Sequence, residues 1–237
     1  MIKGSLLTIE IREEFIKIAE ISKKKGQLFI HNLIQIPALE EVVKDGEILN
    51  TERLANHIRY FLGDEKYKNK KAIFTIHSSK IAQKEAAFPS LKKRLFNEML
   101  RENAQDYFPM AIENYSVRYQ ILEERVVEDK KEIRVSLLAA PLSLLEGYAA
   151  VCKKLQLRLV ALDYNGNSTQ QLIRTFLKDE VSVVLHLEEE TTNLMIMEGK
   201  TLLFQRDVPY GKTSLAYEEV QPLSESEMDK LYEKLKI

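Results

Sequence analysis

Three apolar runs near the start of the chain are repeated near its end, and this repetition limits the possible fold more than any other feature. The first set comprises the runs at residues 5–11, 14–21 and 27–37. The second set comprises the runs at residues 181–187, 192–197 and 201–208. Short runs rich in isoleucine, leucine and valine that are bounded by turn residues are typical of strands. The sequence therefore predicts two three-stranded antiparallel meanders.

The rest of the chain predicts further helices and strands in mixed order. Helices are expected where apolar residues recur at helical spacing, at residues 51–62 after a cap at Asn50 or Thr51, in the segment from Leu91 to Tyr107, and at 142–155, 169–177 and 223–237. Strands are expected at residues 71–76, 115–121, 133–137 and 158–162, the middle two joined by an exposed charged loop. The whole is a mixed α/β chain.

Composition excludes several classes of function. With 35 Lys and Arg against 36 Asp and Glu, the net charge of −1 provides no field for nucleic acid or an anionic membrane. No apolar stretch approaches the roughly 20 residues of a membrane span, and the first residues lack a signal peptide. We therefore expect no nucleic-acid partner and no direct membrane insertion.

Residues that often carry chemistry are scattered. The single cysteine, Cys152, lies in an apolar helical run and is predicted to be buried. The four histidines show no metal-ligand spacing, and no nucleophile elbow surrounds Ser78-Ser79. The sequence therefore predicts no catalytic residues and no metal site, and a protein that is not an enzyme.

Several segments resemble one known family in a consistent order across about residues 5–215. They are Glu10-Ile11-Arg12 with Ile16-Lys17, Asp45-Gly46-Glu47-Ile48, Phe88-Pro89-Ser90-Leu91, Ala104-Gln105-Asp106-Tyr107-Phe108-Pro109, Leu138-Ala139-Ala140 with Tyr148, Leu157-Arg158-Leu159-Val160-Ala161-Leu162-Asp163 and Phe204-Gln205-Arg206-Asp207-Val208-Pro209-Tyr210-Gly211. The chain resembles the type IV pilus assembly protein PilM, an actin-like protein related to the division protein FtsA. The cytoplasmic domain of the secretion protein GspL is similar in architecture.

The resemblance implies an actin-like, ribonuclease-H-like α/β fold with mixed sheets, an inserted subdomain and an incomplete second half. The expected domains are a first actin-like subdomain at residues 1–87 and 163–179, an inserted subdomain at 88–162 and a partial second half at 180–237. Two explanations of the short second half stay open, a shortened chain or a natural protein that lost that lobe.

The two turns that bind phosphate in actin-like ATPases are acidic here. Arg12 stands where the family's first-loop glycine is expected, followed by Glu13 and Glu14, and His186 and Glu188 replace the aspartate and glycine of the second loop. Backbone amides approach a phosphate closely where glycine permits it, and carboxylates add repulsion of about 1 kcal/mol or more per close pair. We therefore expect no cofactor. The degenerate loop positions that could still contact ATP or Mg²⁺ are Glu10, Lys17, Glu188, Thr191 and Thr192.

The resemblance also implies a role and a partner. PilM-like proteins are cytoplasmic scaffolds at the inner face of the cell membrane, where they bind the N-terminal tail of a single-span, PilN-like protein and other platform proteins. The extended tail would lie between the inserted subdomain and the first half, in a groove formed by parts of 72–91 and 104–162. Tyr107, Tyr115 and Tyr119 are the candidate contacts, although aromatic residues at such spacings are also common in cores.

Two alternatives to a scaffold remain at this level. One is an ATP-binding, actin-like ATPase of the PilM/FtsA type, in which Glu10 and Glu188 hold Mg²⁺ through their oxygens. The other is a filament-forming division protein resembling FtsA. The residues also do not distinguish pilus, secretion and competence systems.

Overall fold

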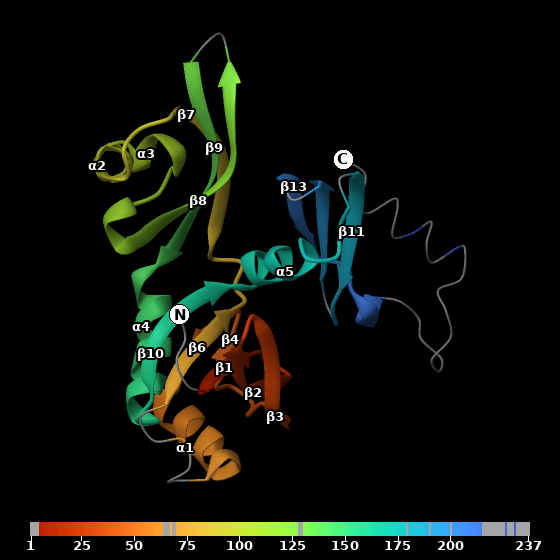
Figure 1. Ribbon diagram of the computed structural model, residues 1–237. Helices are drawn as coiled ribbons and strands as arrows, with labels where there is room; N and C mark the ends of the chain where they lie inside the picture. The colour runs from red at the N-terminus through yellow and green to blue at the C-terminus, as the bar shows by residue number, and fades with distance from the viewer. Residues whose placement is uncertain are drawn as a thin grey trace. The chain divides into compact units, whose positions relative to one another are not determined.

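The computed structural model of the protein describes residues 5–63, 67, 70–127, 130–178, 180–189, 191–199, 201–214, 226 and 230. The chain divides into two compact units, Met1–Ser168 and Thr169–Ile237 (Figure 1). Each unit contains one of the two meanders that the sequence predicts.

The first unit is built on a five-stranded mixed sheet with the strand order β10-β6-β1-β2-β3. Its strands are β1 (Ser5–Ile11), β2 (Phe15–Lys24), β3 (Gln27–Pro37), β6 (Lys71–Ile76) and β10 (Arg158–Tyr164). The first three form an antiparallel meander, whereas β6 and β10 run parallel to β1. The alternation of apolar residues places every second side chain of β1 and β2 in the core. The first predicted meander is confirmed.

Two helices, α1 (Thr51–Leu62) and α4 (Leu142–Lys154), share the core of this sheet and contact one another. The helix α1 begins where the sequence predicts, because the Asn50 side chain accepts the Arg53 N–H at 2.9 Å. The core residues of α1, α4 and β6 include Leu54, Ile58, Tyr148, Val151 and Phe74. Burial of each large apolar side chain contributes about 1.5–3 kcal/mol, so this core fixes both helices on the sheet.

A smaller three-stranded antiparallel sheet lies in the segment inserted between β6 and α4, with the order β7-β9-β8. Its elements are β7 (Ala82–Pro89), α2 (Lys93–Glu102), α3 (Ala104–Tyr107), the 3₁₀ turn η1 (Ile112–Asn114), β8 (Tyr115–Val127) and β9 (Lys130–Pro141). A second hydrophobic cluster, which includes Phe88, Phe96, Val135 and Leu137, joins this sheet to α2. The predicted antiparallel pairing of two strands is confirmed, but both strands extend into the stretch expected to be a charged loop, β8 to Val127 and β9 from Lys130.

The strand pairings divide this segment differently from the predicted insertion, residues 88–162. The insertion begins earlier, because β7 starts at Ala82 and pairs with β9 along its whole length. It ends earlier, because α4 belongs to the first core and β10 pairs with β6. Residues 82–87 contain no β-branched or aromatic side chain, so β7 depends on its pairing with β9 rather than on local preference.

The second unit contains an antiparallel sheet with the order β11-β12-β13. Its strands are β11 (Val181–Leu187), β12 (Thr192–Glu198) and β13 (Thr201–Val208), and the 3₁₀ turn η2 (Lys212–Ser214) follows. The second predicted meander is therefore confirmed. Of the helix predicted at 223–237, Ser226 and Lys230 are helical, and the rest of that prediction lies outside the described residues.

The helix predicted at residues 169–177 begins four residues earlier, as α5 (Asn165–Ile173). The carboxylate of Asp163 explains the shift, because it accepts hydrogen bonds from the Asn167 side chain at 2.8 Å and from the Ser168 hydroxyl at 2.7 Å. A carboxylate that accepts hydrogen bonds from residues of the first helical turn stabilises the start of a helix. The stretch after Ile173 forms turns rather than further helix.

Cys152 lies in the first core, with 2% of its surface exposed, as its apolar surroundings predict. Burial raises the pKa of its thiol to about 11, because the thiolate loses its hydration.

We expect the Cys152 thiol of the native protein to resist alkylation by iodoacetamide at mildly alkaline pH and to react fully in urea. The neutral thiol is favoured by the folded state, so this residue's contribution to stability is present below the unfolded pKa and is lost as pH rises toward 11. Rapid alkylation of the native protein would contradict its burial.

Candidate functional site

The turn between β1 and β2, the predicted position of a first phosphate loop, is closed by contacts within the chain. The Arg12 N–H donates to the Phe15 carbonyl at 2.9 Å, which makes the turn tight. The Arg12 guanidinium also forms an ion pair with Glu10 at 2.9 Å. The Lys17 ammonium lies 4.4 Å from the centre of the Phe15 ring, a cation–π contact. Glu10 and Lys17, both predicted phosphate-loop positions, thus have partners within the chain.

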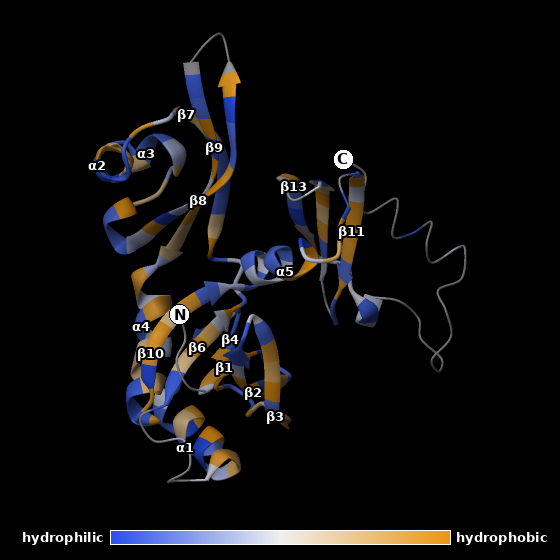
Figure 2. Ribbon diagram, in the orientation of Figure 1, coloured by the Kyte–Doolittle hydropathy of each residue, from blue (hydrophilic) through white to orange (hydrophobic). Residues whose placement is uncertain are grey.

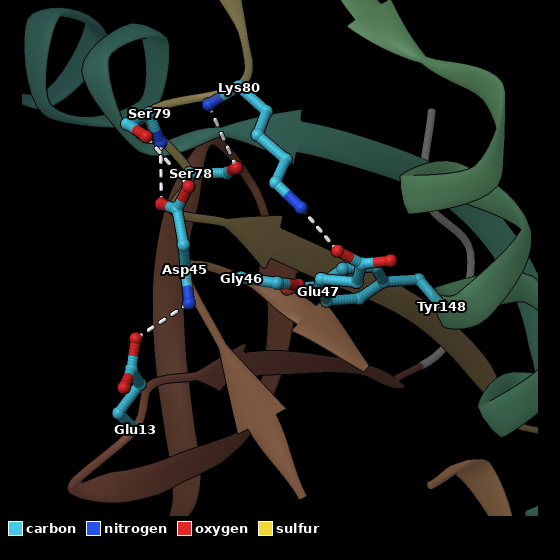
Figure 3. A network of polar contacts seen from close by, with 8 residues as sticks. All are labelled: Glu13, Asp45, Gly46, Glu47, Ser78, Ser79, Lys80 and Tyr148. Carbon is cyan, nitrogen blue, oxygen red and sulfur yellow. Dashed lines mark hydrogen bonds and ion pairs between the residues drawn. The ribbon is translucent and has the colours of Figure 1, made fainter. Parts of the chain in front are cut away.

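A second turn, between β4 (Val43–Lys44) and β5 (Glu47–Ile48), meets this loop (Figure 3). The Glu13 carboxylate accepts the Asp45 N–H at 2.6 Å. The Asp45 carboxylate in turn accepts the Ser79 N–H at 2.7 Å and the Ser79 hydroxyl at 2.6 Å. Phosphate-binding loops work because their backbone N–H groups are available to an anion. Beside this loop, two such groups already donate to carboxylates of the chain.

Gly46 and Tyr148 fix this turn to the core. Gly46 has a φ of +73°, and a Cβ atom there would lie 2.1 Å from the carbonyl oxygen of His77. The Tyr148 hydroxyl donates to the Gly46 carbonyl at 2.9 Å, and burial raises the pKa of that hydroxyl. The turn therefore has the close backbone approach that only glycine permits.

An ion pair between Lys80 and Glu47 lies at the rim of the same network (Figure 3). The hydrogen bond to Glu47 raises the pKa of Lys80. The sequence shows Asp45-Gly46 only as a turn and Ser78-Ser79 only as a strand end. Because β4–β5 and β6 are brought together by the fold, the sequence did not reveal this network.

The predicted second phosphate-loop position, between β11 and β12, is likewise closed. The Glu188 N–H donates to the Thr191 carbonyl at 2.9 Å, and the Thr191 hydroxyl donates to the Glu188 carboxylate at 3.3 Å. The buried Thr192 hydroxyl donates to the Tyr210 carbonyl at 2.6 Å. His186 lies 3.4 Å from Glu188. The three predicted positions in this loop are therefore engaged with each other or with the segment after β13.

A groove of about 860 Å³ lies in the inserted segment, and we call it the β8 groove. It is lined by residues of α2, α3, η1 and β8 and by the first residue of α4, namely Lys93, Asn97, Leu100, Arg101, Ala104, Ile112, Tyr115, Ser116, Val117, Arg118, Tyr119, Ile121 and Leu142. β8 is one of the two edge strands of its sheet, paired with β9 alone among the described strands. One side of its backbone is therefore not used by the sheet.

Two of the three predicted partner-binding tyrosines, Tyr115 and Tyr119, line this groove. The Tyr119 ring also packs 4.5 Å from the ring of the buried Phe96. The ring of Tyr107 instead lies 5.3 Å from that of Phe88, in the cluster between α3 and the sheet. The structure thus brings two of the tyrosines to one surface and gives the third a packing contact.

The charge of the β8 groove was not foreseen from the sequence. Its cations are Lys93 and Arg101, eight residues apart on α2, and Arg118 on β8. None of the lining residues that the structure describes carries a carboxylate. The cations could have been found only by knowing that α2 lies beside β8, because their positions are unremarkable within each element.

Other kinds of site find no support in the described ranges. No group of three or more His, Cys, Asp or Glu side chains there is placed to hold a metal ion. The described helices are all too short or too polar to cross a membrane.

These features define a mixed α/β chain whose fold matches that of known structures. The chain aligns with the PilM–PilN type IV pilus biogenesis complex at a TM-score of 0.77 and 20% identity, over 88% of this chain and 62% of that chain. The cytoplasmic domain of EpsL, an inner-membrane component of the type II secretion system of Vibrio cholerae, aligns at a TM-score of 0.52 and 10% identity, over 87% and 71%. A Bacteroides thetaiotaomicron protein with an actin-like ATPase fold aligns at 0.48 and 11% identity, over 98% and 74%.

The sequence model of the family described as type IV pilus assembly protein PilM matches residues 8–230. The chain belongs to the PilM family, which confirms the resemblance noted from its sequence. It spans 62% of the length of the aligned chain in the PilM–PilN complex. No curated protein sequence matches it.

Proposed function

We propose that this protein is a non-enzymatic scaffold of a type IV pilus assembly platform at the cytoplasmic face of the inner membrane. Its partner would be the cytoplasmic N-terminal tail of a single-span, PilN-like membrane protein, bound in the β8 groove. The observation that carries the proposal is the groove beside the free edge of β8, with Tyr115 and Tyr119 in its lining. Membership of the PilM family and the likeness to a PilM–PilN complex support the choice of partner.

The edge of β8 provides the means of holding an extended tail. An extended peptide can add to a free sheet edge, so that main-chain hydrogen bonds give affinity and side-chain pockets give specificity. Tyr115 and Tyr119 supply rigid aromatic contacts, and aromatic side chains often dominate such interfaces. The cations Lys93, Arg101 and Arg118 can donate hydrogen bonds to acceptor groups of the tail. The groove extends to α4, the helix that packs on the first sheet, because Leu142, the first residue of α4, is part of its lining.

The closed phosphate-loop positions support the non-enzymatic part of the proposal. Glu10, Glu13 and Asp45 add negative charge where a nucleotide's phosphates would bring more, and close like charges cost about 1 kcal/mol or more each. Lys17 and Thr192, the groups best suited to a phosphate, contact Phe15 and Tyr210 instead. We therefore infer that the chain acts through binding rather than hydrolysis.

Calorimetric titration of the chain with a synthetic peptide tests this function. The peptide is the cytoplasmic N-terminal tail of the single-span membrane protein encoded beside it. We expect saturable binding with a micromolar Kd, about −8 kcal/mol, and no binding of a scrambled peptide of the same composition. Failure of a folded sample to bind the tail would refute the partner.

ATP with Mg²⁺, titrated into the same sample, tests the ATPase alternative. No saturable binding is expected up to about 1 mM, where the binding free energy would be only about −4 kcal/mol. Saturable nucleotide binding would show that the acidic loops tolerate a nucleotide, and hydrolysis would then have to be measured. Because the two titrations use different ligands, either part of the proposal can fail alone.

A further inference from the structure

The β2–β3 hairpin exposes an unusual number of apolar side chains near its turn. Leu28, Ile30 and Leu33 are each 62% exposed, and Phe29 is 42% exposed. Further along β3, by contrast, Ile36 is buried in the core of the sheet. The apolar residues lie along β3 in Figure 2, and β3 is an edge strand, paired with β2 alone among the described strands. A long apolar edge invites a binding partner or aggregation.

The turn of the same hairpin is strongly basic. Lys23, Lys24 and Lys25 are consecutive and exposed, and Lys23 lies opposite Leu28 in the pairing of β2 with β3. The register of the sheet places two further cations, Lys71 and Arg158, at the same end, because they are the first residues of β6 and β10.

Glu20 is the carboxylate nearest to the turn along β2. It forms an ion pair with Lys70, so its negative charge is already balanced by another cation. Residues 21–37, from the end of β2 through β3, contain no Asp or Glu. The hairpin therefore combines apolar side chains with local positive charge, although the whole chain carries a net charge of only −1.

We propose that the β2–β3 hairpin docks on the surface of an anionic lipid bilayer. Its lysines would lie among the anionic headgroups, and Leu28, Phe29 and Ile30 would enter the boundary of the acyl chains. Amphipathic, lysine-rich segments bind membranes by this combination of buried apolar area and electrostatic attraction. The expectation of no direct membrane insertion rested on the net charge of −1 for the whole chain and on the lack of a long apolar run. A hairpin with local positive charge that enters only the interface falls outside both criteria.

Charge favours a lipid surface over a second copy of the chain as the occupant. Two copies of β3 could pair edge to edge, but β3 contains no carboxylate to meet the three lysines of the other copy. A bilayer with anionic headgroups supplies that charge over a wide area. The hairpin is distinct from the β8 groove, so docking and tail binding can be measured separately.

Vesicle co-flotation of the whole chain tests the proposal, with phosphatidylcholine vesicles that either contain or lack phosphatidylglycerol. We expect binding to the anionic vesicles only, and weaker binding at high salt because the attraction is screened. The triple variant K23A/K24A/K25A should bind on the order of 100-fold more weakly, since each lysine at an anionic surface is worth about a factor of five. The variant L28S/I30S should bind at least about 10-fold more weakly.

Two matched variants control for charge and apolar area. K84A/K92A/K178A removes three exposed lysines elsewhere, and V181S/V183S removes two comparably exposed apolar side chains from β11. Both should bind as the wild type does.

Three outcomes would overturn the proposal. They are equal loss in the control variants, wild-type binding by the hairpin variants, or no vesicle binding by a folded chain. If sedimentation shows that the wild type is a dimer and that L28S/I30S is a monomer, the hairpin is instead an interface between two copies of the chain. Tail-peptide titration of the hairpin variants should give the wild-type Kd, which separates this test from that of the scaffold function.

Discussion

Replacing Gly46 by alanine is expected to lower the free energy of unfolding by at least about 3 kcal/mol, a large part of a typical domain's stability. The added Cβ would lie 2.1 Å from the His77 carbonyl oxygen, a backbone atom that cannot move without displacing the end of β6. The left-handed conformation of Gly46, with φ +73°, adds about 1–2 kcal/mol for any other residue. Urea denaturation followed by circular dichroism measures the loss.

Gly26 provides the matched control for this substitution. It has a similar conformation, with φ +86°, but a Cβ there would meet no atom within 4 Å. The variant G26A should therefore lose only about 1–2 kcal/mol, the backbone part of the cost. Equal losses in the two variants would show that the turn against His77 is not as close as described.

Replacing Tyr115 by alanine is expected to weaken binding of the partner tail by about 10- to 100-fold. Tyr115 lines the β8 groove at the start of the edge strand, and truncating a central aromatic contact commonly costs about 2 kcal/mol or more. The variant Y115F keeps the ring and should bind within a few-fold of the wild type if the contact is mainly apolar. Calorimetric titration gives the Kd, and thermal melting of each variant shows whether it is folded.

Tyr60 is the matched control, because it lies on α1 outside the groove and is 83% exposed. The variant Y60A should bind the tail as the wild type does. A folded Y115A variant with unchanged affinity would place the tail elsewhere. The same test on Tyr119 is less clean, because its ring packs on Phe96 and its loss would also affect folding.

The strands of both meanders were predictable because local information is sufficient for them. Their apolar runs are bounded by turns such as Lys25-Gly26, and pairing between neighbours in sequence needs no distant partner. The strand β7 and the place of β10 were not predictable in this way. Strand β7 pairs with β9 some 50 residues away and has little intrinsic strand preference, and β10 pairs with the distant β6.

The candidate sites were foreseen unevenly for the same reason. Arg12 and the acidic residues beside it are visible in the sequence, and the family resemblance directed attention to the first loop. The bonds that close the loop join Glu13, Asp45 and Ser79, which are 32–34 residues apart in successive pairs. A groove also depends on which faces meet, so single aromatic positions could suggest tyrosines but could not separate Tyr107 from the two that line it.

Hydrogen–deuterium exchange with and without the partner tail tests the central claim most directly, because it reports where on the chain the tail lies. Amides on the free edge of β8 have no partner strand, so those within residues 115–121 that face outward should exchange quickly in the free chain and slowly in the complex. The account predicts protection there and along the facing part of α2. Saturable binding with protection confined to other elements, and none along β8, would contradict it.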